Sequence, residues 1–191
     1  GGIPALFTGY LKDRGIKVLH QVGLVRNARS AESHGVDAVI AEGYEGGGPR
    51  ALNEVSTLVL VPQMVGALSI PVIASGGIVD ARGIAAALAL GAQGVHMGTR
   101  FIATTQCKAH QNYKEAILAG IDAGTVVVGR YQYPTRLLRT DTALKCREDM
   151  PKKNENPMSN WDSQLGIQAI RRAIIDGDSD NGPAYVGSGV G

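Results

Sequence analysis

The feature that most constrains the fold is a fourfold alternation of short apolar runs with segments of helical character. The runs are residues 16–23, 37–43, 71–77 and 94–100, and a helical segment follows each of them. Four such units within about 110 residues are typical of a parallel sheet with helical crossovers. The runs are almost continuously apolar, as in strands that are covered on both faces. The sequence therefore predicts an α/β protein.

Single residues mark where several helices begin and end. Gly35 and Gly91 stand where a left-handed C-cap is needed, and Asn53 and Asp80 are the expected N-caps. Residues 131–162 are polar, charged and interrupted by proline, so we expect an irregular excursion over one face. We expect residues 1–130 to form half of a barrel. Residues 131–191 would add an irregular lid-like segment and a C-terminal helix to the same domain.

Glycines at the ends of strands favour a (β/α)8 TIM barrel over the alternative, a small doubly wound sheet. A full barrel takes about 250 residues, so four units are half of one. Gly76-Gly77 and Gly98-Thr99 follow consecutive strands. In such barrels the loops after the last two strands form a phosphate site with the N-terminus of a short helix. Backbone N–H groups donate to the anion there, and glycine lets it approach. We therefore expect a phosphate-bearing ligand.

Composition excludes several classes of protein. The formal net charge is +2 and the basic residues are scattered, which argues against nucleic acid as a partner. No apolar run approaches the roughly 18 residues of a membrane span, so we expect no membrane partner. Cys107 and Cys146 have neither metal-ligand nor CxxC spacing, which predicts reduced thiols, no metal site and a cytoplasmic location.

Residues 71–104, which contain the SGGI and MGTRF motifs, resemble the nitronate monooxygenase family, formerly called 2-nitropropane dioxygenases. The FMN-dependent enoyl-acyl-carrier-protein reductase II belongs to the same group. Residues 35–50, 112–120 and 134–140 are also similar to segments of this family. The resemblance implies an FMN-dependent oxidoreductase, of which this chain supplies roughly strands five to eight of the barrel.

The resemblance also implies a set of cofactor-binding residues at the strand ends. These expected FMN contacts are Glu42, Gly47, Gly48, Ser75, Gly76, Gly77, Met97, Gly98 and Thr99. The catalytic base of the family is a histidine at the position that Pro49 occupies here. Proline has no ionisable group and no N–H, so the catalytic residue is unknown, and His96 and His20 are the candidates to replace it.

The loss of the base leaves the reaction open. Reduction of flavin by NADH or NADPH, or oxidation of a small organic substrate, could survive because the cofactor carries the chemistry. The alternatives are a non-catalytic flavin-binding protein and a nitronate monooxygenase that uses another base. The IMP dehydrogenase group shares the phosphate site, but it needs a nucleophilic cysteine after strand six, and residues 42–57 contain none.

The chain begins Gly1-Gly2-Ile3 without a methionine, so we expect the N-terminal half of the barrel, or a second chain, to complete it. Half a barrel would expose two strand edges and an open inner face. A small-molecule substrate is the other expected partner. The sequence does not decide whether the protein forms a homo-oligomer.

Overall fold

A computed structural model describes residues 4–129, 133–149 and 166–191. The chain divides into two compact units. The first unit consists of Gly1–Glu45 and Asn53–Met97, and the second of Gly46–Leu52 and Gly98–Gly191. Each unit has its own sheet.

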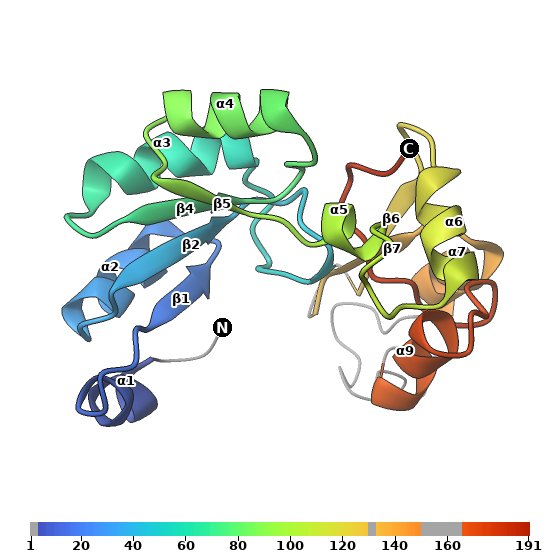
Figure 1. Cartoon of the computed structure of the whole chain (residues 1–191), viewed down its shortest axis with the longest axis horizontal. Helices are drawn as coiled ribbons and strands as arrows, with labels where there is room; N and C mark the ends of the chain where they lie inside the picture. Colours follow the sequence, from blue (N-terminus) through green and yellow to red (C-terminus); the bar gives the residue numbers. More distant parts are fainter. Residues whose placement is uncertain (1–3, 130–132, 150–165) are drawn as a thin grey trace. The chain divides into compact units, whose positions relative to one another are not determined.

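The first unit contains four parallel strands in the order β1-β2-β4-β5. Its elements are α1 (Ala5–Lys12), β1 (Leu19–Val22), α2 (Val25–Ser33), β2 (Ala38–Glu42), α3 (Thr57–Ala67), β4 (Val72–Ser75), α4 (Ala81–Ala89) and β5 (Gly94–His96). Figure 1 shows α3 and α4 on the same side of this sheet. The four predicted βα units are therefore confirmed in their order, and the parallel sheet with them.

Alternation along the strands gives the sheet of the first unit two different faces. The face toward the helices is apolar and buried, and it carries Val22, Val39, Ala41, Val72 and Ala74. The opposite face is more open: Ile40, Glu42 and Ile73 on it are half-buried and His96 is exposed, although Ser75 is buried. The outer strands β1 and β5 each have one neighbour in this sheet.

Three of the four predicted helix caps are confirmed. Gly35 and Gly91 adopt φ values of +80° and +93°, which L side chains rarely adopt. The Asp80 carboxylate accepts hydrogen bonds from the first turn of α4. The prediction for Asn53 is wrong, because α3 begins at Thr57 with Ser56 at its N-cap.

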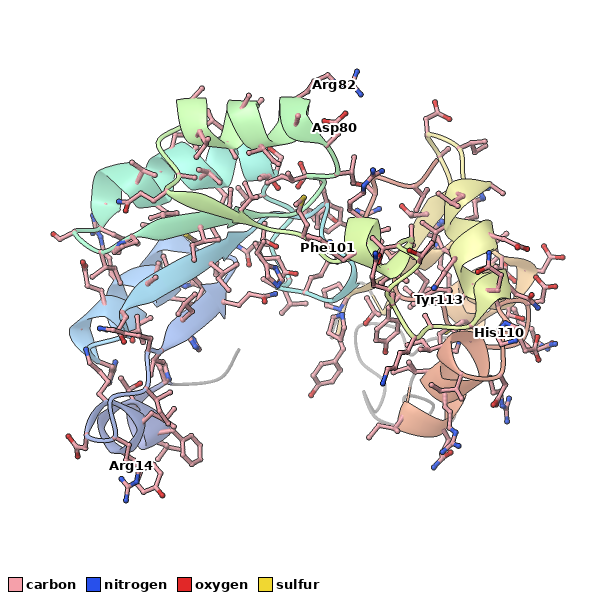
Figure 2. The ribbon with its side chains drawn as sticks, viewed as in Figure 1. Arg14, Asp80, Arg82, Phe101, His110 and Tyr113 are labelled. Carbon is pink, nitrogen blue, oxygen red and sulfur yellow. The ribbon has the colours of Figure 1, made fainter. Side chains whose placement is uncertain are left out.

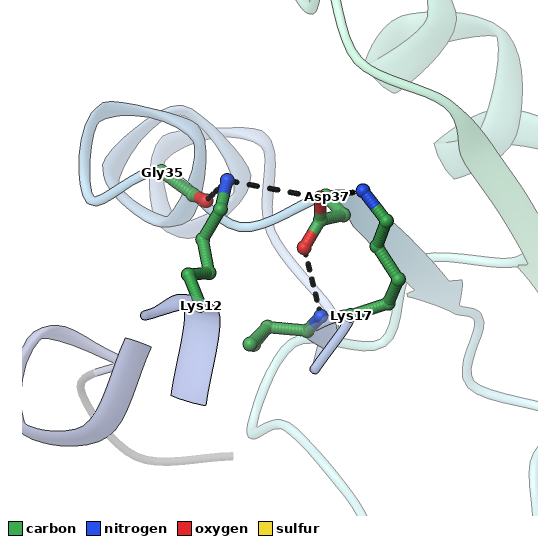
Figure 3. A network of polar contacts seen from close by, with 5 residues as sticks. Lys12, Lys17, Gly35 and Asp37 are labelled. Atoms are coloured by element: carbon green, nitrogen blue, oxygen red, sulfur yellow. Dashed lines mark hydrogen bonds and ion pairs between the residues drawn. The ribbon is translucent and has the colours of Figure 1, made fainter. Parts of the chain in front are cut away.

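An ion-pair network connects α1 to the loop before β2 (Figure 3). The Asp37 carboxylate accepts from the backbone N–H of Val18 at 2.9 Å and from Lys17 Nζ at 3.0 Å. These bonds, with Lys12 Nζ 3.7 Å away, hold the pKa of Asp37 below its ordinary value. Lys12 also donates to the carbonyl oxygen of Gly35 at 2.7 Å. Two lysines and one carboxylate thus fix the end of α1 beside the start of β2.

The second unit contains a small antiparallel sheet in the order β3-β7-β6. Its elements are β3 (Gly48–Pro49), α5 (Thr99–Ile102), α6 (Gln111–Leu118), β6 (Thr125–Val128), β7 (Thr135–Leu138), α7 (Asp141–Asp149) and α9 (Ile167–Ile174).

This sheet corrects the expectation of an irregular excursion over residues 131–162. The strand β7 and the helix α7 both lie in that range. Buried positions in β7 include Thr135 and Leu137, so its polar composition hid a strand that packs on one face. Residues 131–132 and 150–162 of the range lie outside the described residues. The predicted C-terminal helix is α9, and the division into 1–130 and 131–191 stays a prediction.

Tyr113 anchors the core of the second unit. It lies on α6 (Figure 2) and is 1% exposed. Its hydroxyl donates to the carbonyl oxygen of Tyr185 at 2.6 Å, so α6 is tied to the C-terminal segment. Burial raises the pKa of the Tyr113 phenol well above its ordinary value, which keeps the hydroxyl protonated as a donor.

Candidate functional site

The carboxyl ends of three neighbouring strands align one polar row at an edge of the first unit's sheet. The register places Glu42 of β2 beside Ser75 of β4, and Ser75 beside His96 of β5. Paired residues of parallel strands share a face. This face is opposite to the one that carries the buried Ala41 and Ala74. Ligands of α/β sheets bind at the carboxyl ends of strands, so this row is the first part of the candidate site.

A hydrogen bond joins two members of this row. Ser75 Oγ lies 3.1 Å from His96 Nδ1. Ser75 is 6% exposed, whereas the imidazole of His96 is exposed. The buried serine therefore orients the ring through Nδ1. His20, the other candidate base, pairs with Val39, whose side chain belongs to the helix-covered face. The register thus groups His96, and not His20, with Ser75.

The turn after β4 is built from two glycines with positive φ. Gly76 has φ +109° and Gly77 has φ +70°. L side chains rarely adopt such angles, so this backbone path requires glycine. The Thr57 hydroxyl lies 2.9 Å from the carbonyl oxygen of Gly76 and 3.2 Å from that of Ser75. The first residue of α3 therefore holds the start of this turn in place.

The segment after β2 packs against the same threonine. The backbone N–H of Gly43 donates to the carbonyl oxygen of Ser75 at 2.9 Å. A Cβ at Gly43 would overlap the backbone and the hydroxyl of Thr57, so no other residue fits. The Glu45 carboxylate accepts from Thr57 N at 3.0 Å, and its Oε2 also lies 3.1 Å from Thr57 Oγ1. The Glu45 carboxylate therefore satisfies a backbone N–H at the start of α3.

Thr57 is the site residue that sequence reasoning missed. It connects the segment after β2 to the turn after β4, yet no motif of the sequence singles it out. A signal was present in its position, since a threonine directly after Ser56 begins an apolar helical run. The part played by its hydroxyl depends on two loops that only the fold brings together.

The N-terminus of α4 already has its acceptor. Asp80 Oδ1 accepts from Arg82 N at 3.0 Å and from Gly83 N at 3.1 Å. Arg82 Nε also donates to Asp80 Oδ2 at 2.8 Å, and Figure 2 shows both side chains at the start of the helix. The hydrogen bond from the Arg82 side chain is the main reason that the pKa of Asp80 is lowered. An anion near β4 would thus be bound by the glycine turn rather than by this helix end.

The remaining predicted site residues belong to the second unit. Gly98 is the N-cap of α5, and a Cβ built on it meets nothing within 4 Å. Thr99 Oγ1 accepts from the backbone N–H of Gly187 at 2.7 Å. The space beside Gly98 would accommodate a ligand atom, because no described protein atom fills it.

Gly47 and Gly48 have packing reasons of their own. A Cβ on Gly47 would lie 2.5 Å from the backbone carbon of Val186, and one on Gly48 would lie 3.2 Å from the Tyr185 ring. Gly48 also has φ +71°. Pro49 is exposed and pairs with Thr135 in β3 and β7. Packing against the C-terminal segment therefore suffices to explain both glycines, and their contact with a cofactor stays a prediction.

The predicted residues thus fall into two sets. The first unit holds Glu42, Ser75, Gly76, Gly77, Met97, His96 and His20, and the second holds Gly47, Gly48, Pro49, Gly98 and Thr99. Within the part of the chain that the structure describes, no three His, Cys, Asp or Glu side chains are grouped to hold a metal ion. In that same part, no helix is long and apolar enough to cross a membrane.

Comparison with known proteins places this geometry in a class and then in a family. The structure resembles FabK from Thermotoga maritima with a TM-score of 0.90 and 44% identity, covering 99% of this chain and 59% of that one. It resembles a nitroalkane oxidase from Streptomyces ansochromogenes with a TM-score of 0.80 and 30% identity, covering 97% of this chain and 55% of that one. These likenesses confirm the predicted α/β class of the (β/α)8 barrel type.

The sequence model of the nitronate monooxygenase family matches residues 6–191, so the chain belongs to this family. A probable nitronate monooxygenase of Staphylococcus saprophyticus is 45% identical over 126 residues, which are 61% of this chain and 36% of that protein. The chain therefore spans little more than a third of that curated relative and about three fifths of the FabK chain.

Proposed function

We propose that the protein is an FMN-dependent oxidoreductase that acts on a small organic substrate. The observation that carries this proposal is membership of the nitronate monooxygenase family together with the glycine turn at Gly76 and Gly77. The likenesses to FabK, at 44% identity, and to a nitroalkane oxidase, at 30% identity, support it.

The residues present fit the phosphate group of FMN. A glycine turn at the carboxyl end of β4 offers backbone N–H groups, and its shape is held by Thr57. Asp80 lies at the N-terminus of α4, and its carboxylate is neutralised there by Arg82 and by two backbone N–H groups. Its negative charge is therefore already compensated beside the proposed phosphate position. In the second unit the open space beside Gly98 accommodates a ligand atom. FMN, when bound, supplies the electron transfer, and the chain supplies its position.

The chain's own residues then have defined tasks. Gly76 and Gly77 would donate backbone hydrogen bonds to the phosphate, and Gly98 and Thr99 are proposed to do the same from the start of α5. The first turn of any α-helix has N–H groups without intrahelical partners, which suits an anion. Glu42, Gly47, Gly48, Ser75 and Met97 are proposed as further contacts of the cofactor. NADH or NADPH is the proposed electron donor, and a cytoplasmic location stays a prediction.

The test measures binding and electron transfer separately in the full-length protein. FMN titration, followed by flavin fluorescence, should show saturable binding, and NADH or NADPH should then be consumed faster than with free FMN. Gly98→Ala should weaken FMN binding with little change in stability, because its Cβ would fill space that no described protein atom occupies. Gly66→Ala is the matched control, since its Cβ also meets nothing within 4 Å but lies in α3.

Two results would contradict the proposal. Failure of the full-length protein to bind FMN would remove the cofactor from the account. Tight FMN binding without nicotinamide or substrate turnover would instead favour the alternative, a non-catalytic flavin-binding protein.

A further inference from the structure

Position 49, where the resemblance implies a catalytic histidine, holds a proline that is exposed in β3. Proline can neither accept nor donate a proton. A reaction that removes a proton from carbon therefore needs another group. Imidazole is the side chain best suited to this task near neutral pH. The chain has four histidines, at positions 20, 34, 96 and 110.

Geometry separates these four histidines. His34 and His110 cap helix ends, where His34 Nδ1 lies 2.6 Å from the carbonyl oxygen of Ser30 and His110 Nδ1 accepts from Asn112 N at 3.2 Å. His20 shares its strand face with the buried Val22 and pairs with the buried Val39. His96 is the histidine at the carboxyl end of a strand, on the face opposite to the helices.

The surroundings of His96 suit a group that must be held still and yet stay accessible. Its Nδ1 lies 3.1 Å from Ser75 Oγ, and Ser75 is nine-tenths buried. The ring is exposed, so Nε2 is the nitrogen left to meet a substrate. Ser75 is followed directly by Gly76, the first residue of the proposed phosphate turn. The carboxylate of the same row is Glu42, two strands away from His96.

We propose that His96 accepts the proton from a carbon acid substrate and that Ser75 is the positioning residue for its imidazole. The inference rests on the proposed function for the substrate class. In the step itself the C–H bond beside a nitro group breaks, and its electron pair moves onto the nitro oxygens to form the nitronate. The proton forms a new N–H bond at Nε2, the imidazole becomes imidazolium, and solvent then takes up the proton. No oxidant takes part in this step.

The experiment follows this step apart from oxidation. Full-length, FMN-loaded protein is placed in D2O with nitroethane, and exchange of the α-hydrogens is followed by proton NMR under nitrogen at low buffer concentration. General-base catalysis contributes about 10² to 10⁴ in rate, so His96→Gln should lower the catalysed exchange by that factor. Added imidazole should restore part of the exchange in His96→Ala. His34→Gln is the matched control and should exchange at the wild-type rate.

The role of Ser75 has its own readout. Nitrogen-15 shifts of the His96 ring report which ring nitrogen carries the proton, and Ser75→Ala should change them and lower the exchange rate. Ser75→Thr keeps a hydroxyl and should preserve both. If His96 and Ser75 had only structural roles, added imidazole would not restore exchange in His96→Ala, and the threonine hydroxyl would not preserve exchange in Ser75→Thr.

Each outcome decides the proposal. The proposal would be overturned if the wild type exchanged no faster than buffer, or if His96→Gln exchanged at the wild-type rate. It would also be overturned if His20→Gln lost the exchange while His96→Gln kept it. Absence of FMN binding with His96-dependent exchange would leave this inference standing while the proposed function fails. FMN binding with an exchange rate that does not depend on His96 would contradict this inference and leave the proposed function standing.

Discussion

Gly43→Ala should be among the most damaging changes in the first unit. The new methyl group would lie 2.6 Å from Thr57 Cα and closer still to Thr57 N and Oγ1. Carbon atoms in ordinary contact are about 3.5 Å apart, so the segment after β2 must retreat by about 0.9 Å from the start of α3. Backbone cannot rotate away as a side-chain end can. The retreat strains the hydrogen bonds that Gly43 N and Thr57 Oγ1 make to the turn after β4.

The expected cost has two parts. Overpacking of a close-packed site costs about 1 to 3 kcal/mol, and each of the two strained hydrogen bonds contributes about 1 kcal/mol. The free energy of unfolding should therefore fall by about 3 to 5 kcal/mol. Urea unfolding of the full-length protein, with FMN affinity in parallel, measures both stability and the state of the turn.

Gly66→Ala is the control for this prediction. Its Cβ meets nothing within 4 Å and it lies inside α3, so alanine should raise stability by about 0.5 to 1 kcal/mol. A Gly43→Ala protein within about 0.5 kcal/mol of the wild type would refute the reasoning, because a surface substitution costs no more than that.

Two further predictions concern stability alone. Tyr113→Phe should lower the free energy of unfolding by about 1 kcal/mol, because the carbonyl oxygen of Tyr185 loses this donor, and a urea midpoint equal to that of the wild type would contradict this. The Asp80 carboxylate has a lowered pKa in the folded protein, so its contribution is present above pH 3.8 and is lost as the pH falls through the folded value. Asp80→Asn should therefore be less stable than the wild type at pH 7 and should lose less stability on acidification, as thermal unfolding at pH 7 and pH 3 would show.

The parallel part of the fold could be predicted because its signals are local. Each strand of the first unit is a short apolar run, and glycines such as Gly35 and Gly91 mark where helices end. Asp80 caps α4 within three residues of itself. The prediction of Asn53 as an N-cap was wrong because the start of α3 depends on a distant residue. The start of α3 is set by Glu45, whose carboxylate accepts from Thr57 N across a loop that local sequence does not describe.

The antiparallel sheet could not be predicted because its partners are distant in the sequence. Gly48 pairs with Arg136, and the two-residue strand β3 has no signal of its own. The same limit applies to the glycine-rich loop. The resemblance implies a cofactor contact at Gly47, which stays a prediction, and the structure adds that the backbone of Val186 leaves no room for a side chain there. A glycine reports a close approach, and the approaching group comes from the fold.

The last prediction concerns Pro49 and separates two chemistries. If this position faces substrate, as the resemblance implies, then proline leaves no base there and Pro49→His should raise turnover of nitroalkanes such as nitroethane, whose α-carbon must lose a proton. General-base help contributes about 10² to 10⁴ in rate where it is used. Flavin reduction by NADH or NADPH should change little, because hydride transfer depends on distance and alignment. The comparison uses both substrates on full-length wild type and variant with FMN bound.

The structure adds a control to this comparison. Pro49 is exposed and pairs with Thr135, so a histidine fits sterically but releases the restriction that proline places on β3. FMN affinity measured alongside the rates distinguishes a chemical gain from a loosened strand. Combining Pro49→His with His96→Gln tests whether one imidazole can replace the other. If His96 is the base of the wild type, the double variant should recover the nitroethane turnover that His96→Gln alone loses. A double variant as slow as His96→Gln would show that an imidazole at position 49 cannot serve this reaction.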